Sequence, residues 1–366
     1  MATDLPGELS LTTAYINRVA TAVPPYDIHD AFRRFAQSLF KDRRNSLLFR
    51  RMADKADIDH RYSSLAPSNQ PEGETVDAQR FYVRGDFPDT AARMRRFEQD
   101  APALVESAVA RLRIDAERDR ITHLLMTCCT GFSAPGLDLE VVERCRLPSG
   151  VERTMIGFMG CYAAINALKL ARHIVRSEPS ARVLIVNVEL CTLHLKETTD
   201  LEQVLSFLLF GDGCAACLVT ADPVGTALDS FRAVLVPDTR DLITWNIREY
   251  GFDMVLSGRV PATIQTALHN HMGEILHGAP AAAIDLWAVH PGGRTVLDAV
   301  EQAFGLAPAA LMTSREVLRR YGNMSSATVM FVIEKLMRSG ARGRKGCAMS
   351  FGPGLIAETM LFHTAA

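Results

Sequence analysis

The same pattern occurs twice in this chain, 162 residues apart. The shift aligns three pairs of segments: Gly160-Cys161 with Gly322-Asn323, residues 122–128 with 284–290, and residues 182–188 with 344–350. A mostly apolar, helix-like run follows Gly160-Cys161 and another follows Gly322-Asn323. The segments of the other two pairs have the pattern of strands. A strand, a loop, a buried helix and a second strand that recur at one offset predict two similar α/β halves.

The length of the chain agrees with this duplication. At 366 residues it exceeds what one ordinary hydrophobic core needs, so two linked halves fit its size. We place the first half at residues 1–222 and the second at 223–366. The boundary falls near residues 221–225, where a proline and a glycine separate two apolar stretches.

The centre of the first half is the stretch from Gly157 to Val175. After Cys161 it is apolar nearly all the way round a helix, which is typical of a helix buried inside a domain. Cys161 would lie in the first turn, where unpaired N–H groups and the helix dipole favour a thiolate over a thiol. Most buried cysteines are nevertheless inert. The local pattern alone leaves a reactive and an inert Cys161 both open.

The duplication supplies partners for this cysteine. If the halves pack about a pseudo-twofold axis, the starts of their buried helices meet, and Cys161 and Asn323 face one site. His290 ends the strand-like segment that matches residues 122–128. A thiol, an imidazole and an amide brought together from distant positions predict a nucleophile, its base and an oxyanion donor.

The composition excludes several function classes. A net charge of −2 and an apolar share of 48% describe a globular protein and argue against nucleic acid as the main partner. The stretch from Met1 to Tyr15 is polar and acidic, so we do not expect a signal peptide. Apolar runs such as 183–188 are too short to cross a bilayer. We expect a cytoplasmic protein without membrane insertion.

The eight cysteines indicate neither a disulfide framework nor a metal site. Cys214 and Cys217 form a Cys-x-x-Cys pair, but they lie in a strand-like apolar run without a second pair at zinc-finger spacing. We expect no bound metal and no tightly bound cofactor.

A basic, helix-like segment lies between His29 and His60. A charge run of this kind is most often a solvated helix face. The alternative interpretation is that the segment is a binding site for a phosphorylated carrier, because arginine and lysine bind phosphate.

Five spaced motifs together resemble those of the type III polyketide synthases, the chalcone-synthase-like family. They are Gly157 to Tyr162, Phe210-Gly-Asp-Gly, His290-Pro-Gly-Gly, Gly322-Asn323-Met-Ser-Ser-Ala and Phe351-Gly-Pro-Gly. The resemblance extends in order from about Tyr15 to Phe362. No single motif would make it specific, whereas the set of five does.

The resemblance implies a thiolase-type fold, five-layered α/β/α/β/α, that acts as a homodimer. By the family pattern Cys161 takes a starter acyl group from a coenzyme A thioester, and His290 deprotonates or ion-pairs with its thiol. His290 and Asn323 hold the thioester carbonyl of malonyl-CoA while it loses carbon dioxide, and they stabilise the enolate. Phe210 stands as a gate beside the cysteine. The substrates are acyl-CoA and malonyl-CoA.

The resemblance also points to coenzyme A contacts and to departures from the family pattern. Arg51 and Lys55 match basic positions that contact coenzyme A, whereas Leu48 replaces a further lysine of plant members. Met254 occupies the position of the second gating phenylalanine. Ser350 replaces the first glycine of the Gly-Phe-Gly-Pro-Gly loop. Trp245 replaces a glycine of the cyclisation cavity.

The starter follows from small side chains. Thr130, Ala134 and Cys191 match small residues that open a tunnel in fatty-acyl-accepting bacterial members; plant members carry at the Ala134 position a Met that reaches into the neighbouring subunit. Burial of an alkyl chain there is worth about 0.8 kcal/mol per CH₂. The alternative is that these are ordinary core residues. We expect a medium- or long-chain acyl-CoA starter and, because of bulky Trp245, an alkylresorcinol from three malonyl extensions, with alkylpyrones as side products.

Two other classes stay open from the sequence. One is another condensing enzyme of the same fold, such as a ketoacyl synthase III, although Pro291-Gly292-Gly293 follows His290 instead of the usual Gln-Ala-Asn. The other is a non-catalytic acyl-CoA-binding homologue, against which the intact Cys161, His290 and Asn323 argue.

Overall fold

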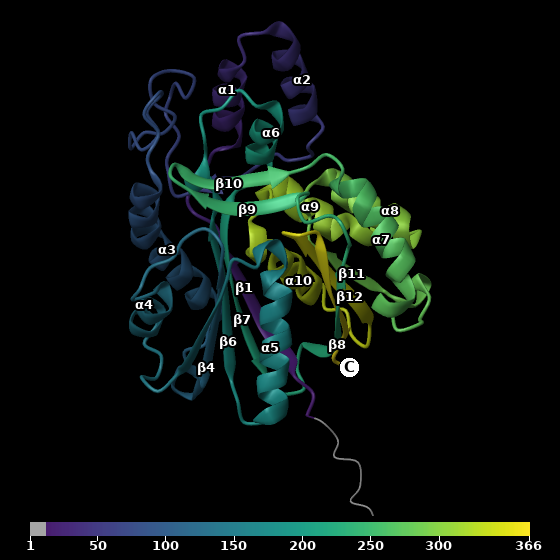
Figure 1. Ribbon diagram of the computed structural model, residues 1–366. Helices are drawn as coiled ribbons and strands as arrows, with labels where there is room; N and C mark the ends of the chain where they lie inside the picture. Colours follow the sequence, from purple (N-terminus) through teal and green to yellow (C-terminus); the bar gives the residue numbers. More distant parts are fainter. Residues whose placement is uncertain (1–11) are drawn as a thin grey trace, which may run out of the picture.

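The computed structural model describes residues 12–366 (Figure 1). Residues 1–11, which include most of the segment read as lacking a signal peptide, lie outside the described part. The elements of the first half are β1 (Tyr15–Ala22), β2 (Tyr26–Asp27), α1 (His29–Leu39), α2 (Arg43–Asp54), β3 (Tyr62–Ser63), α3 (Thr90–Leu112), β4 (His123–Cys128), α4 (Leu137–Arg144), β5 (Glu152–Gly157), α5 (Ala163–Ser177), β6 (Val183–Leu190), α6 (Leu201–Leu209) and β7 (Asp212–Thr220). Those of the second are β8 (Thr226–Leu235), β9 (Ile243–Arg248), β10 (Gly251–Leu256), α7 (Val260–Ile275), β11 (Leu286–Val289), α8 (Arg294–Phe304), α9 (Met312–Tyr321), α10 (Thr328–Arg338), β12 (Lys345–Gly352) and β13 (Ile356–Thr364).

The predicted duplication is visible in these elements. β4, α5 and β6 of the first half correspond to β11, α10 and β12 of the second, at the positions that the 162-residue shift aligned. The Cys-x-x-Cys pair lies within β7, as its apolar pattern indicated. β7 ends at Thr220 and β8 begins at Thr226, on either side of the boundary proposed from the sequence.

The strands of both halves form one hydrogen-bonded sheet of nine strands, in the order β11-β12-β13-β8-β1-β7-β6-β4-β5. The join between the halves is short, because β1 pairs with β7 along its whole length but with β8 only at Tyr15–Ala227 and Ile16–Thr226. The strands of the first half and those of the second half therefore form two parts of the sheet, which meet at β1.

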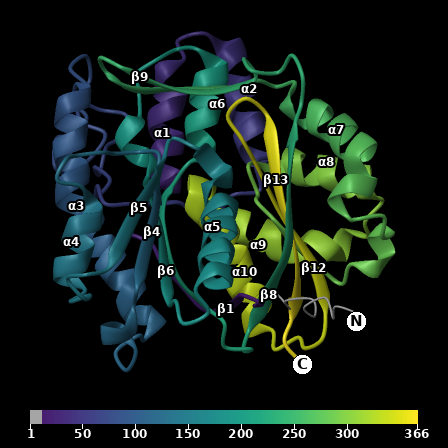
Figure 2. The ribbon, with the colours of Figure 1, turned by 60° about the horizontal axis from the view of Figure 1, so that its bottom comes forward.

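Three apolar clusters show that the predicted five-layered arrangement is correct. α3 and α4 cover the outer face of the first half, and α7 and α8 cover the outer face of the second (Figures 1 and 2). α5 and α10 lie together between the two sheet faces and share the middle cluster. All eight residues of β6 are buried, with alternate side chains in the outer and the middle cluster, which is typical of a strand covered on both faces. No helix among residues 12–366 has the length and apolarity needed to span a bilayer.

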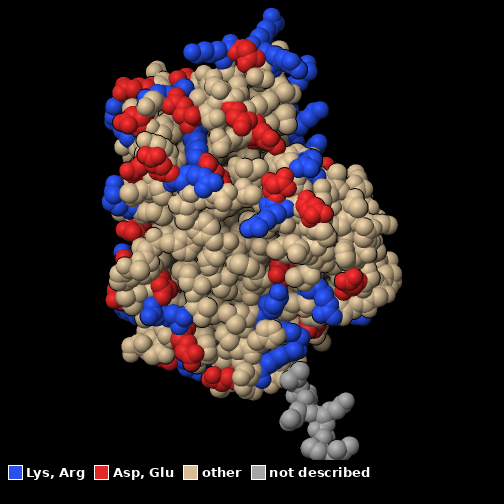
Figure 3. All heavy atoms as spheres, viewed as in Figure 1, with Lys and Arg blue, Asp and Glu red and all other residues tan. Residues whose placement is uncertain are grey.

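The basic segment forms two helices, α1 and α2, at one end of the molecule. Lys and Arg side chains surround this end in Figure 3. α2 buries Phe49 and Ala53 and leaves the rest of its surface in solvent. It packs on α6, which leads into the Phe210 motif.

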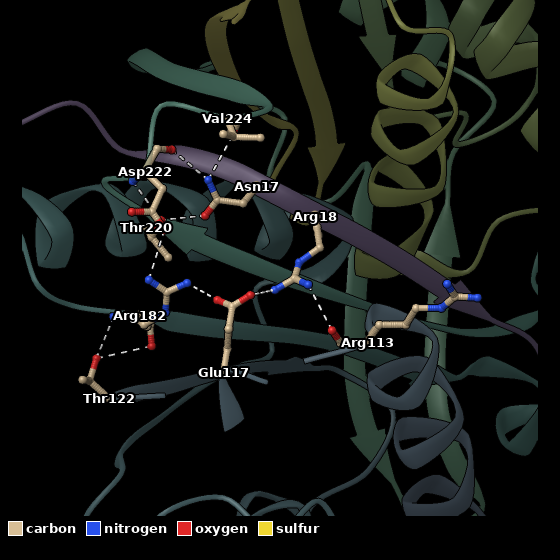
Figure 4. Close-up of polar contacts among 9 residues, drawn as sticks. All are labelled: Asn17, Arg18, Arg113, Glu117, Thr122, Arg182, Thr220, Asp222 and Val224. Atoms are coloured by element: carbon tan, nitrogen blue, oxygen red, sulfur yellow. Dashed lines mark hydrogen bonds and ion pairs between the residues drawn. The ribbon is translucent and has the colours of Figure 1, made fainter. Parts of the chain in front are cut away.

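A polar network closes the opposite end of the first half (Figure 4). Glu117, just after α3, joins the guanidinium groups of Arg18 on β1 and Arg182 before β6. Arg182 also donates to Asp222 at 3.1 Å. Because β4 and β6 are parallel, this network fastens their amino ends and leaves their carboxyl ends for the motif loops.

Candidate active site

Cys161 lies in a short 3₁₀ turn, Gly160–Tyr162, directly before α5. Gly160 has a φ of +75°, and a Cβ there would overlap the ring of Pro353, so the turn requires glycine. A Cβ at Gly352 would lie 3.3 Å from the backbone nitrogen of Cys161. The Phe351-Gly-Pro-Gly motif therefore packs directly on the cysteine. All eight cysteines are in the described residues, and Cys161 alone is partly exposed, although its sulfur is largely removed from water.

Asn323 occupies the matching position of the second half. Its backbone N–H donates to the Leu209 carbonyl at 2.8 Å, and its carbonyl accepts from Gly211 at 2.9 Å, so the chain around Phe210 and Asn323 is paired. Its side-chain Oδ1 accepts from the backbone N–H of Ser325 at 2.8 Å. This bond leaves the Nδ2 amide as the donor available to a ligand.

Two of the predicted catalytic residues, Cys161 and Asn323, lie side by side, and Gly292 links Asn323 to His290. The Asn323 and Ser325 side chains lie beside the Cys161 thiol and act to lower its pKa. Asn323 Nδ2 donates to the Gly292 carbonyl at 3.4 Å, and a Cβ on Gly292 would lie 3.7 Å from His290 Nε2. Gly292 thus contacts both Asn323 and His290, which directly follows β11.

The ionisation of Cys161 differs from the sequence expectation. Burial raises the pKa of its thiol to about 12, and the hydrogen bonds from Ser325 and Asn323 only partly offset this effect. Burial lowers the pKa of His290 to about 3. The expectation of a resting thiolate is therefore wrong, because desolvation outweighs the helix start. With these pKa values, thiol and imidazole are both neutral near pH 7.

A cavity of about 510 Å³, including the space open to solvent, adjoins Cys161. Five residues predicted from the sequence line it: Thr130, Cys191, Phe210, Trp245 and Met254. Six further residues that the sequence reading did not select also line it: Cys129, His194, Phe207, Ile243, Ser325 and Pro353.

Two predicted pocket residues lie elsewhere. Ala134 is exposed and lines a separate surface hollow with Phe97, so it does not reach this cavity from within its own chain. Ser350 is fully buried on β12, beside the strand end that carries His290, and does not line the cavity.

An aromatic wall shapes one side of the cavity. His194 stacks on Phe252 with ring centroids 4.1 Å apart, and Trp245 meets both rings edge to face. Trp245 Nε1 donates to the Cys129 carbonyl at 2.7 Å. His194 Nε2 lies 2.7 Å from the Thr130 carbonyl, and Nδ1 accepts from the Phe252 N–H at 3.1 Å. Both nitrogens are thereby occupied, so His194 is a rigid part of the wall.

A buried carboxyl lies behind the cavity. Glu189 accepts from the Cys129 N–H and the Thr130 hydroxyl, both at 3.0 Å, and from the Ser326 hydroxyl at 2.6 Å. Burial raises its pKa to about 7, although these hydrogen bonds act in the opposite direction. An acidic residue in the otherwise apolar run of β6 was the sequence signal for this group, and our reading of the sequence passed over it.

The two predicted coenzyme A contacts, Arg51 and Lys55, lie at the solvent-facing end of α2. Both side chains are exposed, and neither forms an ion pair within residues 12–366. α2 packs on α6, and Phe207 of α6 lines the cavity. No group of three or more metal-ligating side chains occurs in the same range.

Comparisons with known proteins identify the family. The pattern of the chalcone and stilbene synthase N-terminal domain matches residues 12–223, and that of the C-terminal domain matches residues 227–366. The chain is 32% identical to the "alpha-pyrone synthesis polyketide synthase-like Pks18" of Mycobacterium tuberculosis, over 98% of this chain and 93% of that protein. It is also 32% identical to bisdemethoxycurcumin synthase of Oryza sativa subsp. japonica, over 86% of this chain and 82% of that protein.

Solved structures agree with the sequence matches. PKS-I of the brown alga Ectocarpus siliculosus superposes with a TM-score of 0.86 at 27% identity, over 98% of this chain and all of that one. The type III domain of Steely1 from Dictyostelium superposes with a TM-score of 0.88 at 21% identity, over 97% of this chain and all of that one, which shows a shared fold. The chain therefore belongs to the chalcone and stilbene synthase family, and it is a type III polyketide synthase with a thiolase-type fold that condenses malonyl-CoA units as an acyltransferase.

Proposed function

We propose that this synthase takes a medium- or long-chain fatty acyl-CoA as its starter. The observation that carries the proposal is the cavity beside Cys161, in which Thr130 and Cys191 are small and Cys191 is buried. An alkyl chain placed there would leave water at a gain of about 0.8 kcal/mol per CH₂. Membership of the family sets aside the ketoacyl-synthase alternative.

The proposed reaction begins with loading of the starter. Cys161 gives its proton to His290 Nε2, and the thiolate attacks the acyl-CoA carbonyl. The coenzyme A thiolate then leaves and takes a proton from solvent, so Nε2 keeps its hydrogen. Malonyl-CoA then loses carbon dioxide while His290 and the Asn323 amide donate to its thioester carbonyl. The resulting enolate carbon attacks the acyl-cysteine, which frees Cys161 and leaves a chain two carbons longer on coenzyme A. Fixed donors of this kind are worth about 3 kcal/mol each at the transition state.

For product release, we propose three such extensions followed by ring closure to an alkylresorcinol, with alkylpyrones as side products. Trp245 supports the bent chain that aldol closure needs, because its ring is held on the wall by the bond to Cys129. Lactone closure is the second candidate, and the relative named for alpha-pyrone synthesis favours it.

We further propose that the enzyme is a cytoplasmic homodimer without a tightly bound cofactor. β5 is an edge strand that pairs only with β4, and Met155 on β5 and Met159 just after it are each 37% exposed. Ala134 lies at the surface, which is compatible with a position next to a partner subunit. Few charged side chains interrupt the middle of the face seen in Figure 3. Arg51 and Lys55 would bind the phosphates of coenzyme A.

Product mass spectrometry tests the proposal directly. The purified protein is incubated with malonyl-CoA and starters from acetyl- to stearoyl-CoA, together with coumaroyl-CoA. We expect aliphatic products, and the resorcinol should be lighter by one carbon dioxide than the pyrone carrying the same number of extensions. Products from coumaroyl-CoA alone would exclude the fatty acyl starter. Acyl-CoA binding without any condensation would indicate the non-catalytic alternative.

A size change in the cavity is a second test. Cys191→Leu should shorten the longest accepted acyl chain, whereas the matched Cys191→Ala should retain or lengthen it. An unchanged chain-length profile in both variants, with the fold intact, would show that the chain does not enter this cavity.

A further inference from the structure

Ser350 lies beside His290 on the neighbouring strand. β11 and β12 are parallel, and their register pairs Val289 with Met349. The ladder continues by one residue, because the His290 N–H donates to the Met349 carbonyl at 2.8 Å. His290 and Ser350 are therefore direct neighbours on strands that lie about 4.8 Å apart.

Both side chains point to the same face of the sheet. Along β11 and β12 the odd-numbered residues pack in the outer cluster, whereas Ala288 and Ala348 pack in the middle one. His290 and Ser350 continue the even-numbered set, so their side chains extend toward the middle layer. Gly352, the next even-numbered residue, supports this placement, because it packs on the Cys161 backbone there.

The two side chains hold three buried polar atoms without a partner. Within residues 12–366, His290 Nδ1, His290 Nε2 and Ser350 Oγ form no hydrogen bond. His290 and Ser350 are 1% and 0% exposed. Nε2 lies toward Gly292 and Asn323, the side on which the chemistry takes place. Nδ1 sits closer to its own backbone and so to the neighbouring strand. A buried polar group without a partner costs about 1–3 kcal/mol, so a hydrogen bond between the Ser350 hydroxyl and Nδ1 would satisfy two of the three atoms at once.

We propose that Ser350 is the positioning residue of His290, whose hydroxyl hydrogen-bonds Nδ1 and so presents Nε2 to Cys161 and to the thioester. This inference rests on the proposed roles of Cys161 and His290. It concerns a position where the family pattern has glycine, so the reaction does not depend on this hydroxyl for its existence. The Ser350 hydroxyl instead determines how rigidly the imidazole is held and which tautomer it adopts.

A hydroxyl can hydrogen-bond His290 Nδ1 whether or not that nitrogen carries a hydrogen. When Nε2 accepts the thiol proton, Nδ1 carries hydrogen and Ser350 Oγ accepts from it. In a neutral His290 with its hydrogen on Nε2, Nδ1 is bare and the Ser350 hydroxyl donates to it. A carboxylate could serve only the first state, since it accepts but does not donate.

The other polar groups near Ser350 and His290 either form hydrogen bonds elsewhere or lie on the Nε2 side of the imidazole. Glu358 on β13 is the register partner of Ser350 across β12, and its carboxylate accepts from Lys169 of α5 at 2.7 Å. The Tyr162 hydroxyl donates to the Pro353 carbonyl at 3.4 Å. Cys161 belongs to the reacting side. Ser350 is therefore the uncommitted neighbour of Nδ1.

Four variants at this position form the test: Ser350→Ala removes the hydroxyl, Ser350→Gly restores the family residue, and Ser350→Thr and Ser350→Val add equal bulk with and without a hydroxyl. Thermal melting first identifies the folded variants. The readouts are kcat and KM for malonyl-CoA decarboxylation, and the pH profile of Cys161 alkylation by iodoacetamide, followed by peptide mass spectrometry.

We expect Ser350→Ala and Ser350→Gly to lower kcat about fivefold, the worth of one neutral hydrogen bond, with little change in KM. Their Cys161 alkylation should require a higher pH, because the imidazolium that forms with the thiolate has lost its acceptor. Ser350→Thr should stay closer to wild type than Ser350→Val in both readouts. Equal pH profiles in wild type and Ser350→Ala, or equal effects of Thr and Val, would overturn the inference. Absence of decarboxylation by the wild-type protein would instead refute the proposed roles of Cys161 and His290.

Discussion

Glu189 should make the stability of this enzyme depend on pH. Its carboxyl is completely buried behind the cavity, and burial raises its pKa from 4.5 to about 7. The folded protein thus holds the proton more tightly than the unfolded chain does. The stabilisation from the neutral carboxyl is fully present below pH 4.5 and is lost as the pH rises through 7. A shift of this size corresponds to about 3 kcal/mol, most of which is lost between pH 5 and 8.

Glu189→Gln removes this titration and retains the shape of the side chain. The amide oxygen can accept from Cys129 and Thr130, and the amide nitrogen can donate to the Ser326 hydroxyl, which then reverses its role. We measure the free energy of unfolding by urea denaturation at pH 5 and pH 8, and expect its change between the two pH values to be smaller in Glu189→Gln than in wild type by about 2–3 kcal/mol.

Asp212 offers a matched control. It is also completely buried, its pKa is raised by burial to about 7, and it accepts from the Thr192 N–H and hydroxyl at 2.8 and 2.7 Å. Asp212→Asn should remove a comparable share of the pH dependence by itself, without the same effect on the pKa of Cys161. A Glu189→Gln protein with the full wild-type pH dependence would refute the assignment to Glu189.

The same variant has a catalytic readout. The charge of ionised Glu189 contributes to the raised pKa of the Cys161 thiol. Removing that charge should let iodoacetamide alkylate Cys161 faster at pH 8 in Glu189→Gln. An unchanged alkylation rate would show that the carboxyl and the thiol do not interact.

Three further predictions concern stability, substrate binding and chemistry. Glu117→Ala leaves two arginine side chains of the network in Figure 4 without their shared partner and should lower the free energy of unfolding by about 2 kcal/mol in urea denaturation. The double variant Arg51→Ala/Lys55→Ala should raise the KM for acyl-CoA and weaken its dependence on salt, because two phosphate contacts are lost. Cys161→Ala should abolish starter loading and retain some malonyl-CoA decarboxylation, whereas Asn323→Ala should lose both, as measured by release of carbon dioxide.

Each of these has a control on the same element or a contrary outcome. Asp119→Ala, at an exposed position near Glu117, should change stability by less than about 0.5 kcal/mol. Arg50→Ala, on α2 beside Arg51, should leave the KM unchanged; an equal rise would mean that general positive charge matters and not a defined contact. Complete loss of decarboxylation in a folded Cys161→Ala protein would refute the division of roles.

The duplication made much of the fold predictable from the sequence. One offset of 162 residues identified the strands and helices that carry Cys161 and Asn323, and the spacing of the motifs placed His290 with them. The order of the nine strands in the sheet could not be predicted. The alternation of apolar and polar residues does not reveal a contact as short as the two residue pairs between β1 and β8.

Properties that depend on the environment of a side chain were less accessible. The helix start at Cys161 was visible in the sequence, but the depth of burial that raises its pKa was not. Glu189 behind the cavity and His194 and Phe252 in its aromatic wall come from separate elements. Their spacing in the sequence therefore does not show that they lie near one site. Ala134 was placed in the pocket by resemblance, whereas the structure puts it at the surface of its own chain.

The two halves contribute different chemistry from the same backbone. Gly160 and Gly322 both have positive φ values, +75° and +67°, and each precedes the residue that the site uses. In one half that residue is a thiol and in the other it is an amide. An amide at the second position adds a donor without a charge, and a second buried charge beside an already desolvated thiol would cost several kcal/mol. Since α5 and α10 meet only in the middle layer, neither half contains the site alone, and the distance between sulfur and amide is set by how the halves pack. Substitutions in that shared cluster should therefore impair catalysis before they unfold either half.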